Sequence, residues 1–422
     1  MTLSAWFLLA CAVPVLLAGE WLHRRVPFFP RYNIPVPVVG GLTFALLVLA
    51  ANTSGLTAFS FASKVSAAGW LWLVTPGMDW GEGAAKNVNL PLLVGFFTCV
   101  GLAAPVRVLR SGGRALLVLL LAATVIAVIQ NAVGVALAAG LGVPPLLGVV
   151  CGSLTLVGGH GTALGFASSF EQAGLASAAS AAAAAATFGL VAGGLLAGPL
   201  AEWLLRRTNP MADGAAWAGQ AASTASFFGD LRALGAGGRS ALSHALMIAA
   251  CIKAGAWLGF GLERTGAALP AYMGALLVGL AVRAVHDAMG GTWLRGEVLA
   301  RWSAVLLALF LAVTLASLNL RELAAIAGPM LVILIVNTGV TLLFAAFVVW
   351  PLLGRNHEAG TMVAGLVGFG VGSTATAVAA MDAIVRRRGP APRATTLVPP
   401  TGGFLIDFTN APVIAAFIRL FS

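Results

Sequence analysis

The chain has 422 residues, of which 59% are hydrophobic and only 9% are charged. About a quarter of the residues of a soluble globular domain are usually charged, so this composition excludes that class and indicates a polytopic membrane protein in a lipid bilayer. The net charge of +10 does not indicate a nucleic-acid partner, because the basic residues stand in short clusters between apolar stretches and not on one aromatic-rich face.

Ten apolar stretches are long enough to cross about 30 Å of hydrocarbon as helices, which predicts an all-α fold with about ten transmembrane helices. Five lie in the first half, at residues 3–21, 36–51, 88–104, 115–139 and 175–205. The other five lie at 241–261, 267–282, 298–318, 330–350 and 397–420. Between residues 57 and 87 an apolar, tryptophan-rich stretch is too short to span, and we predict an interfacial helix there.

A glycine-rich loop precedes the last span of each half. The first, Gly158 to Thr162, lies in a re-entrant hairpin predicted at about 144–170, and the second, Gly368 to Thr374, in one at about 358–385. Non-helical backbone at membrane depth is tolerated only where protein encloses it or where it lines a cavity. Two such interrupted segments in matching places predict a transport site.

The order of spans and loops is the same in both halves. Since each half has an odd number of spans, the second must enter the membrane in the opposite orientation, so we predict two inverted five-span repeats. The first comprises residues 1–205 and the second 241–422, joined by a cytoplasmic linker at 206–240. Loops on one side carry eighteen lysines and arginines, against four on the other. The positive-inside rule therefore predicts that both termini are periplasmic.

Asp407 is the only acidic residue placed midway along a span, where an ionisable side chain usually belongs to an ion or proton path. A purely structural role, in which the carboxylate pairs with a buried partner, is the alternative. Asn410 is one helical turn away and faces the same side. Sodium prefers oxygen ligands, as hard cations do. The predicted ion-binding set for sodium, the only metal expected, is Asp407, Asn410, Gln130, Asn131 and Asn337.

The two loops are predicted to bind the substrate. Glycines let backbone groups approach a ligand closely, and helix N-termini at the loops favour a carboxylate. The candidates are Ser153, Thr155, Gly159, His160, Gly161, Thr162, Gly370, Gly372, Ser373, Thr374 and Thr376. The hydroxyl groups could instead bond back to their own helices. A lone histidine makes a poor metal site, so His160 is expected to fix the loop by a hydrogen bond more readily than to carry a proton.

The chain resembles the bacterial sodium/glutamate symporter family through six segments in the family's order. They are residues 34–42 (IPVPVVGGL), 130–134 (QNAVG), 158–162 (GGHGT), 186–191 (ATFGLV), 368–372 (GFGVG) and 404–407 (FLID). The resemblance implies an inner-membrane importer of L-glutamate coupled to sodium. It also implies two inverted halves with re-entrant hairpins, a homodimer and an elevator-like motion. The chain departs from the family pattern at Ala163, Ala375 and Ala380, where glycine, proline and asparagine are expected.

Other functions are compatible with these patterns. Within transporters, the cargo could be another carboxylate and the coupling ion a proton. An ion channel also uses re-entrant loops, although filters are usually built from repeated subunits around a pore. We expect no enzymatic activity and no cofactor, because the sequence offers neither a nucleophile with its base nor a metal pair. Lys253, the only basic residue deep in a span, is expected to pack or to extend toward the membrane surface.

Overall fold

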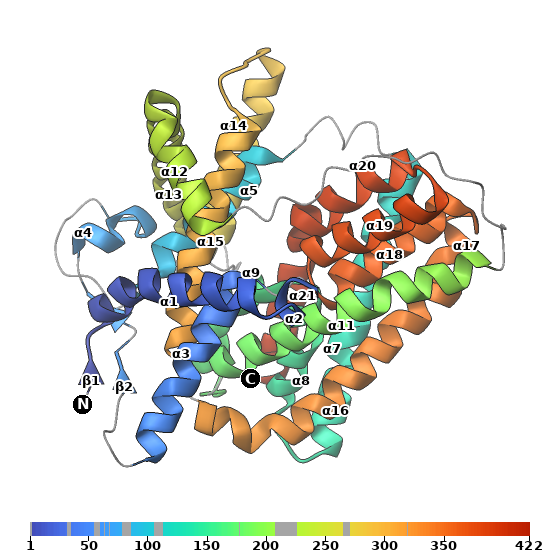
Figure 1. The fold of residues 1–422 in the computed structure, drawn as a ribbon, viewed down its shortest axis with the longest axis horizontal. Helices are drawn as coiled ribbons and strands as arrows, with labels where there is room; N and C mark the ends of the chain where they lie inside the picture. The colour runs from blue at the N-terminus through green and yellow to red at the C-terminus, as the bar shows by residue number, and fades with distance from the viewer. Residues whose placement is uncertain are drawn as a thin grey trace. The chain divides into compact units, whose positions relative to one another are not determined.

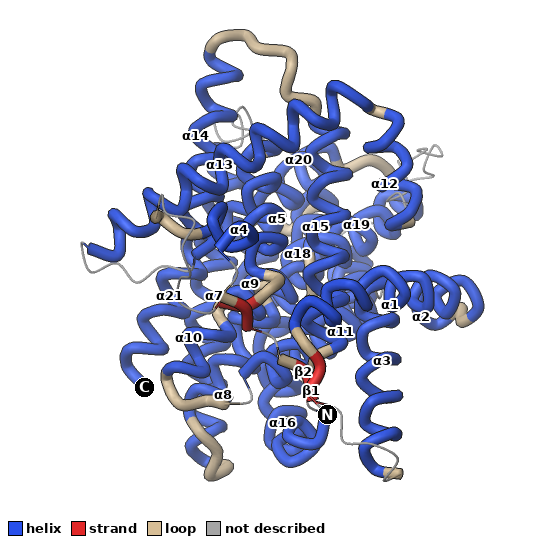
Figure 2. Tube along the Cα trace, turned by 90° about the vertical axis from the view of Figure 1, so that its left-hand side faces the viewer, coloured by secondary structure: helices blue, strands red, loops and turns tan. Residues whose placement is uncertain are grey.

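The computed structural model describes residues 2–31, 35–54, 60–62, 64–66, 68–77, 86–104, 113–176, 178–206, 226–264, 271–318 and 320–422. Helices dominate these ranges (Figure 1). Their β structure is limited to two short pairs (Figure 2). In the first, β1 (Thr2–Leu3) runs parallel to β2 (Ser60–Phe61); in the second, β3 (Lys64–Val65) runs antiparallel to β4 (Lys86–Asn87). The predicted all-α class is confirmed.

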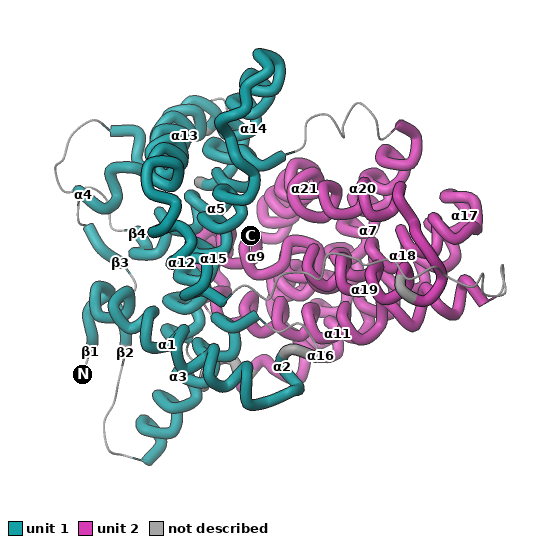
Figure 3. Tube along the Cα trace, turned by 45° about the horizontal axis from the view of Figure 1, so that its top comes forward, with its two compact units in different colours: residues 1–30, 35–106, 225–321 teal, residues 31–34, 107–224, 322–422 magenta. Residues whose placement is uncertain are grey.

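The chain forms two compact units (Figure 3). Unit 1 comprises Met1–Pro30, Pro35–Val106 and Ala225–Arg321, and unit 2 comprises Arg31–Ile34, Arg107–Thr224 and Glu322–Ser422. Each unit therefore takes segments from both halves of the sequence. The predicted repeats, with boundaries at 205 and 241, are continuous stretches of sequence. The two units are defined by packing, so they do not test those boundaries.

Unit 1 contains closely packed helices. They are α1 (Ala5–Arg25), α3 (Val36–Thr53), α4 (Ala68–Leu71), η1 (Trp72–Val74), α5 (Leu90–Ala103), α12 (Phe227–Ala236), α13 (Gly238–Arg264), α14 (Ala271–Ala288) and α15 (Gly296–Ala316), with the short α2 (Phe28–Arg31) at the first unit boundary. Glycines allow close contact, since a Cβ at Gly101 of α5 would meet the Leu276 carbonyl oxygen of α14. The Phe97 and Tyr272 rings stack between the same helices, with centroids 3.9 Å apart.

Lys253 lies in α13 with its side chain turned toward residues 72–77. Its Nζ donates hydrogen bonds to the carbonyl oxygens of Trp72, Thr75 and Gly77 at 2.9, 2.8 and 2.7 Å. The ammonium also lies 4.2 Å from the centroid of the Trp72 ring, within cation–π distance. Three backbone acceptors use all three donors of the ammonium, so this lysine packs by fixing a loop against α13.

Unit 2 contains the remaining elements. They are α7 (Gly113–Gly140), α8 (Pro145–Val149), η2 (Val150–Leu154), α9 (Gly159–Gly165), α10 (Ala167–Gln172), α11 (Ala178–Arg206), α16 (Leu320–Phe344), η3 (Ala345–Val349), α17 (Trp350–Leu352), α18 (His357–Val371), α19 (Thr374–Arg388), α20 (Pro392–Pro400), η4 (Thr401–Leu405) and α21 (Ile406–Phe421). The elements η2, η3 and η4 are π-helical turns. Such turns occur mostly as single bulges in α-helices and often at functional sites.

Eight helical segments of the described chain are long and apolar enough to cross a membrane. They are α1, α3, α7, α11, α15, the 238–262 part of α13, residues 326–352 and residues 392–421. The third and seventh predicted spans are also helical. However, α5 has only 14 residues, which is about 21 Å, and α14 is not among the eight. The multi-span character is confirmed, and the number ten and the inverted orientation stay predictions.

Some predicted features fall partly outside the described residues. In the 57–87 segment the described helical structure is limited to residues 68–74. The predicted linker at 206–240 has residues 207–225 outside the description, and its end forms α12 and the start of α13. Arg107, Arg110 and Arg207, which support the topology prediction, also lie outside.

Candidate functional site

The first glycine loop (residues 158–162) follows a broken helix. Gly152 leaves the helical conformation inside η2, with φ −104° and ψ −138°, and a Cβ there would lie 2.5 Å from Asn131 Oδ1. Only glycine fits so near that amide. Asn131 Oδ1 accepts a hydrogen bond from the backbone N–H of Ser153 at 2.8 Å, one of the donors that the break leaves free. Gly159, with φ +61°, then makes the turn into α9.

The second glycine loop (residues 368–374) connects α18 and α19, and its turn is fixed by a capping box. The Ser373 hydroxyl accepts from the Thr376 N–H at 3.3 Å, and the Thr376 hydroxyl oxygen accepts from the Ser373 N–H at 2.9 Å. The same Thr376 hydroxyl lies 2.7 Å from the Gly368 carbonyl oxygen, to which it donates. The N-terminus of α19 is therefore held at this loop.

The two loops approach each other within unit 2. A Cβ at Gly159 would lie 3.5 Å from the Gly372 carbonyl oxygen, an ordinary van der Waals distance. Helix α11 supports the second loop with a glycine face: a Cβ at Gly189 would meet the Val371 carbonyl oxygen, and one at Gly193 would lie 3.1 Å from the Gly368 carbonyl oxygen. The backbones of the two loops and α11 thus form one close assembly.

Amide side chains of two long helices each bind a backbone carbonyl from the other half of the sequence. Gln130 of α7 donates through Nε2 to the Gly370 carbonyl oxygen and to Thr341 Oγ1, both at 2.8 Å. Asn337 of α16 donates through Nδ2 to the Cys151 carbonyl oxygen at 3.0 Å. These contacts are reciprocal between the halves. They satisfy backbone carbonyls that the interrupted helices leave without an intrahelical donor.

Helix α21 brings Asp407 and Asn410 to the first loop. Asp407 is 6% exposed, and its Oδ1 accepts a hydrogen bond from the Thr162 hydroxyl at 3.0 Å. Asn410 Nδ2 donates to the Ser153 carbonyl oxygen at 3.1 Å. Among the described side chains, no lysine, arginine or histidine forms an ion pair with Asp407. The carboxylate is therefore buried with one hydroxyl donor and without a described counter-charge.

Several oxygen atoms of this cluster have no hydrogen-bond partner among the described residues. They are Gln130 Oε1, Ser153 Oγ, Asn337 Oδ1 and Asn410 Oδ1. The orientation of the three amides is settled by their other end, because each nitrogen donates to a carbonyl oxygen and so leaves its oxygen unpaired. A buried polar atom left without a partner is unfavourable by about 1–3 kcal/mol. Oxygen acceptors without donors suit a small hard cation.

Three of these acceptors belong to residues that meet at one short segment, 151–153. Ser153 is part of it, Asn337 binds the Cys151 carbonyl, and Asn410 binds the Ser153 carbonyl. The structure thus brings together four of the predicted site residues, Ser153, Asn131, Asn337 and Asn410, and places Asp407 beside Thr162. Two other pairs of predicted site residues also meet. Gln130 donates a hydrogen bond to the Gly370 carbonyl oxygen, and Gly159 lies close to Gly372.

Other predicted residues have structural contacts of their own. The Thr155 hydroxyl donates to the Val150 carbonyl oxygen at 2.6 Å, the bond back to its own helix considered from the sequence. His160 Nε2 lies 3.1 Å from Thr187 Oγ1 of α11, which fixes α9 to α11. No hydrogen bond is described for the side chain of Thr374, and Gly161 lies half-buried in α9.

Sequence reasoning missed Thr341 and Thr187, which bind Gln130 and His160. Thr341 stands four residues after Asn337 and so on the same helix face, a spacing that could have indicated it. Of the departures from the family pattern, Ala163 is fully buried in α9, whereas Ala375 is exposed in the first turn of α19. Ala380 is buried and lines a cavity beside α11.

Comparisons with known proteins cover both loops. A family model described as sodium/glutamate symporter matches residues 1–76 and 65–390. The chain is 36% identical over 421 residues to the sodium/glutamate symporter of Escherichia coli (strain K12), covering 98% of this chain and 96% of that protein. It is 34% identical over 418 residues to the sodium/glutamate symporter of Haemophilus influenzae, with the same coverage. The similarity extends over nearly the full length of all three chains.

Proposed function

Because this chain belongs to the sodium/glutamate symporter family, we propose that it carries L-glutamate across the bacterial inner membrane together with sodium. The names of its relatives supply the cargo and the coupling ion. The observation that carries the proposal is the group of buried oxygen atoms around residues 151–153 beside the uncompensated Asp407 carboxylate. Such a group is what a dehydrated sodium ion requires.

Sodium is proposed to bind at the 151–153 segment, which precedes the first glycine loop. Ser153, Asn337 and Asn410 each hold an unpaired oxygen there. Asp407, one helical turn before Asn410, supplies the negative charge and accepts a hydrogen bond from Thr162. Gln130 of α7 has an unpaired Oε1 and is hydrogen-bonded to the second loop, so it would connect the ion site to that loop. Asn131 fixes the Ser153 backbone. A cation there would satisfy acceptors that no described donor satisfies.

Glutamate is proposed to bind between the two glycine loops. The N-terminus of α19 offers backbone N–H groups and the positive end of a helix dipole to a carboxylate. The Thr376 N–H is used by the Ser373 cap and the Ala377 N–H by the Ser373 carbonyl, so those of Thr374 and Ala375 are the available donors of the first turn. The adjacent Gly370 and Gly372 allow close approach of the ligand to the backbone.

Alternating access is proposed to occur by an elevator-like movement of unit 2, with two inverted repeats and a homodimeric assembly. Two observations support this. Unit 2 alone contains both glycine loops and every candidate site residue, so it could carry the cargo as one body. In addition, Gln130 of α7 binds Gly370 of the second half and Asn337 of α16 binds Cys151 of the first, a reciprocal pattern compatible with an inverted repeat.

Counterflow uptake in proteoliposomes tests the function. Labelled glutamate, aspartate, a 2-oxo acid and a hydroxy acid are compared, each with and without a sodium gradient. Saturable glutamate uptake that a sodium gradient drives is expected. Uptake driven only by a pH gradient would show that the coupling ion is a proton and not sodium. Preferential uptake of another acid would show that the cargo is that acid and not glutamate. Non-saturable flux without exchange would indicate a channel and contradict the proposal.

A further inference from the structure

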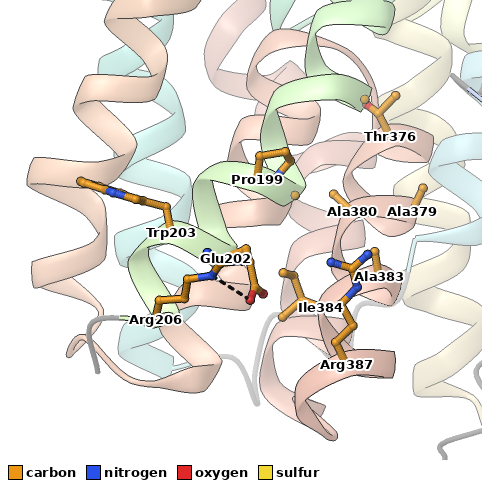
Figure 4. Close-up of a pocket in the computed structure, with 12 residues that line it drawn as sticks. Pro199, Glu202, Trp203, Arg206, Thr376, Ala379, Ala380, Ala383, Ile384 and Arg387 are labelled. Atoms are coloured by element: carbon orange, nitrogen blue, oxygen red, sulfur yellow. Dashed lines mark ion pairs between the residues drawn. The ribbon is translucent and has the colours of Figure 1, made fainter. Parts of the chain in front are cut away.

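A cavity of about 570 Å³ lies between α11 and α19 in unit 2 (Figure 4). Small residues leave this space open, with Gly194 and Gly198 on α11 and Ala379, Ala380 and Ala383 on α19. Contacts of α11 close both ends of this space. Gly193 packs against Gly368 and Gly372 of the second glycine loop at the inner end, and Glu202 binds Arg388 of α19 at the outer end. The cavity therefore lies between two contacts that hold its walls in place.

The inner end of the cavity reaches the proposed substrate site. Thr376 lines it there, and its hydroxyl is bonded to Gly368 and Ser373 of the second glycine loop. From Thr376 to Arg387, α19 rises by about 16 Å over eleven residues, so the cavity follows the helix from the loop to its charged end. A solute that moves along it would pass from the arginines at one end to the loop at the other.

The outer end of the cavity is positively charged. Arg206 and Arg387 line it together with one carboxylate, Glu202 (Figure 4). Glu202 is already paired, because Arg388 binds it through Nε at 3.0 Å and Nη2 at 2.8 Å, and Arg206 lies 3.6 Å away. Among the described residues, no carboxylate pairs with the exposed Arg387. The positive charges of Arg206, Arg387 and Arg388 therefore outnumber the one negative charge of Glu202 at this end.

We propose that this cavity is the passage between the second glycine loop and the cytoplasm for the anionic cargo, and that Arg387 and Arg206 attract the anion to it. This rests on the proposed function and adds a route and its selectivity residues. A charged cleft with low-dielectric walls concentrates ions of opposite sign and raises their association rates by about 10- to 1,000-fold. The volume lies within the range of small-molecule sites, about 300–1,000 Å³. The positive-inside rule assigns the arginine end to the cytoplasm.

Cysteine modification tests the passage without requiring transport. Ala383→Cys is made in a protein whose four native cysteines are alanine, and its reaction rates with two methanethiosulfonates of similar size are compared, one anionic and one cationic. The anionic reagent is expected to react faster than the cationic one at low salt. Arg387→Gln should lower that rate ratio about three- to tenfold, whereas the matched control Arg355→Gln, an arginine of the same unit outside the cavity, should not. Ala379→Cys, one turn nearer the loop, serves as a second reporter.

Two further measurements separate the possible occupants. Glutamate should slow the reaction at residue 383 in sodium-containing liposomes, and Arg387→Gln should raise KM for uptake from the cytoplasmic face at low salt without changing kcat. Equal rates for both reagents, or no change of ratio in Arg387→Gln, would overturn the proposal. Slowing by phosphatidylglycerol but not by glutamate would assign the cavity to a lipid headgroup and also overturn it. If the anionic reagent reacts faster than the cationic one but the protein takes up no glutamate, the cavity would still be an anion passage and the proposed cargo would be wrong.

Discussion

At the scale of single residues, Asp407 is the residue on which the proposed sodium coupling depends most. Its carboxylate is buried, with the Thr162 hydroxyl as donor and no described cation beside it. An isolated buried charge is strongly unfavourable, and pairing or metal coordination normally offsets it. Since α21 also contributes Asn410 to the 151–153 segment, a bound cation would join that helix to the first glycine loop.

Asp407→Asn is expected to lower sodium affinity about ten- to a hundredfold, because a charge-assisted contact in a buried site contributes about 1.5–3 kcal/mol. The asparagine retains one oxygen for Thr162, so substrate affinity at saturating sodium should change much less. Sodium-concentration curves of uptake by purified protein in liposomes measure this. The control is Asp230→Asn, a buried aspartate of α12 in unit 1. An unchanged sodium half-saturation would end the sodium-ligand role, and loss of a pH-gradient response would indicate a proton carrier.

Lys253→Met is expected to lower thermal stability while transport per folded molecule is retained. The substitution removes three hydrogen bonds to backbone carbonyls of residues 72–77. Trp72 and Thr75 are half-buried and Gly77 is exposed, so water replaces part of the loss and each bond contributes about 0.5–1.5 kcal/mol. Thermal unfolding in detergent measures the change. Lys64→Met, an exposed lysine of β3, provides the comparison and should have little effect. A specific loss of glutamate affinity with intact folding would place Lys253 in the transport machinery instead.

At the level of elements, the glycine face of α11 explains how a non-helical loop is held inside unit 2. Gly189 and Gly193 let the backbone of the second loop lie directly against the helix, where any side chain would intervene. The loop carbonyls in turn receive donors from Gln130 and Thr376. Interrupted helices at membrane depth need such enclosure, because lipid cannot hydrogen-bond their free backbone groups.

Gly189→Ala is expected to destabilise unit 2 by about 1–3 kcal/mol and to reduce substrate affinity, since its Cβ would collide with the Val371 carbonyl oxygen, which cannot turn aside as a side chain can. Gly339→Ala in α16 is the matched control, because a Cβ there meets open space and alanine favours the helix. Thermal unfolding and substrate binding are measured for both. Equal behaviour of the two variants would contradict the close packing described here.

For the whole molecule, the proposed inverted arrangement makes a directional prediction. Eighteen basic loop residues against four predict that both termini are periplasmic and that the two glycine loops enter from opposite sides. Alkaline phosphatase fused after Ser422 should be active, and a fluorescent reporter that folds only in the cytoplasm should be dark. A matched fusion within the 207–225 segment should give the reverse pattern. The opposite result for the C-terminal fusion would contradict two five-span inverted halves.

Local properties of the sequence were sufficient for the fold class and for the approximate positions of most of the long apolar helices. Hydrocarbon thickness and hydropathy decide these features, and both can be read from a window of about twenty residues. The helical ranges α7 and α11 lie close to the predicted spans 115–139 and 175–205. The six motif segments also identified the family that the comparisons then showed.

Only the tertiary structure decided which polar groups meet. Gln130 and Gly370 are 240 positions apart, and Thr162 and Asp407 are 245 apart. Hydropathy gives no information on how each helix is rotated about its axis, and that rotation determines the direction of its side chains. For the same reason the sequence did not indicate that Lys253 fixes residues 72–77, or that two units each combine segments of both halves. These features depend on packing between distant segments, which a linear pattern does not contain.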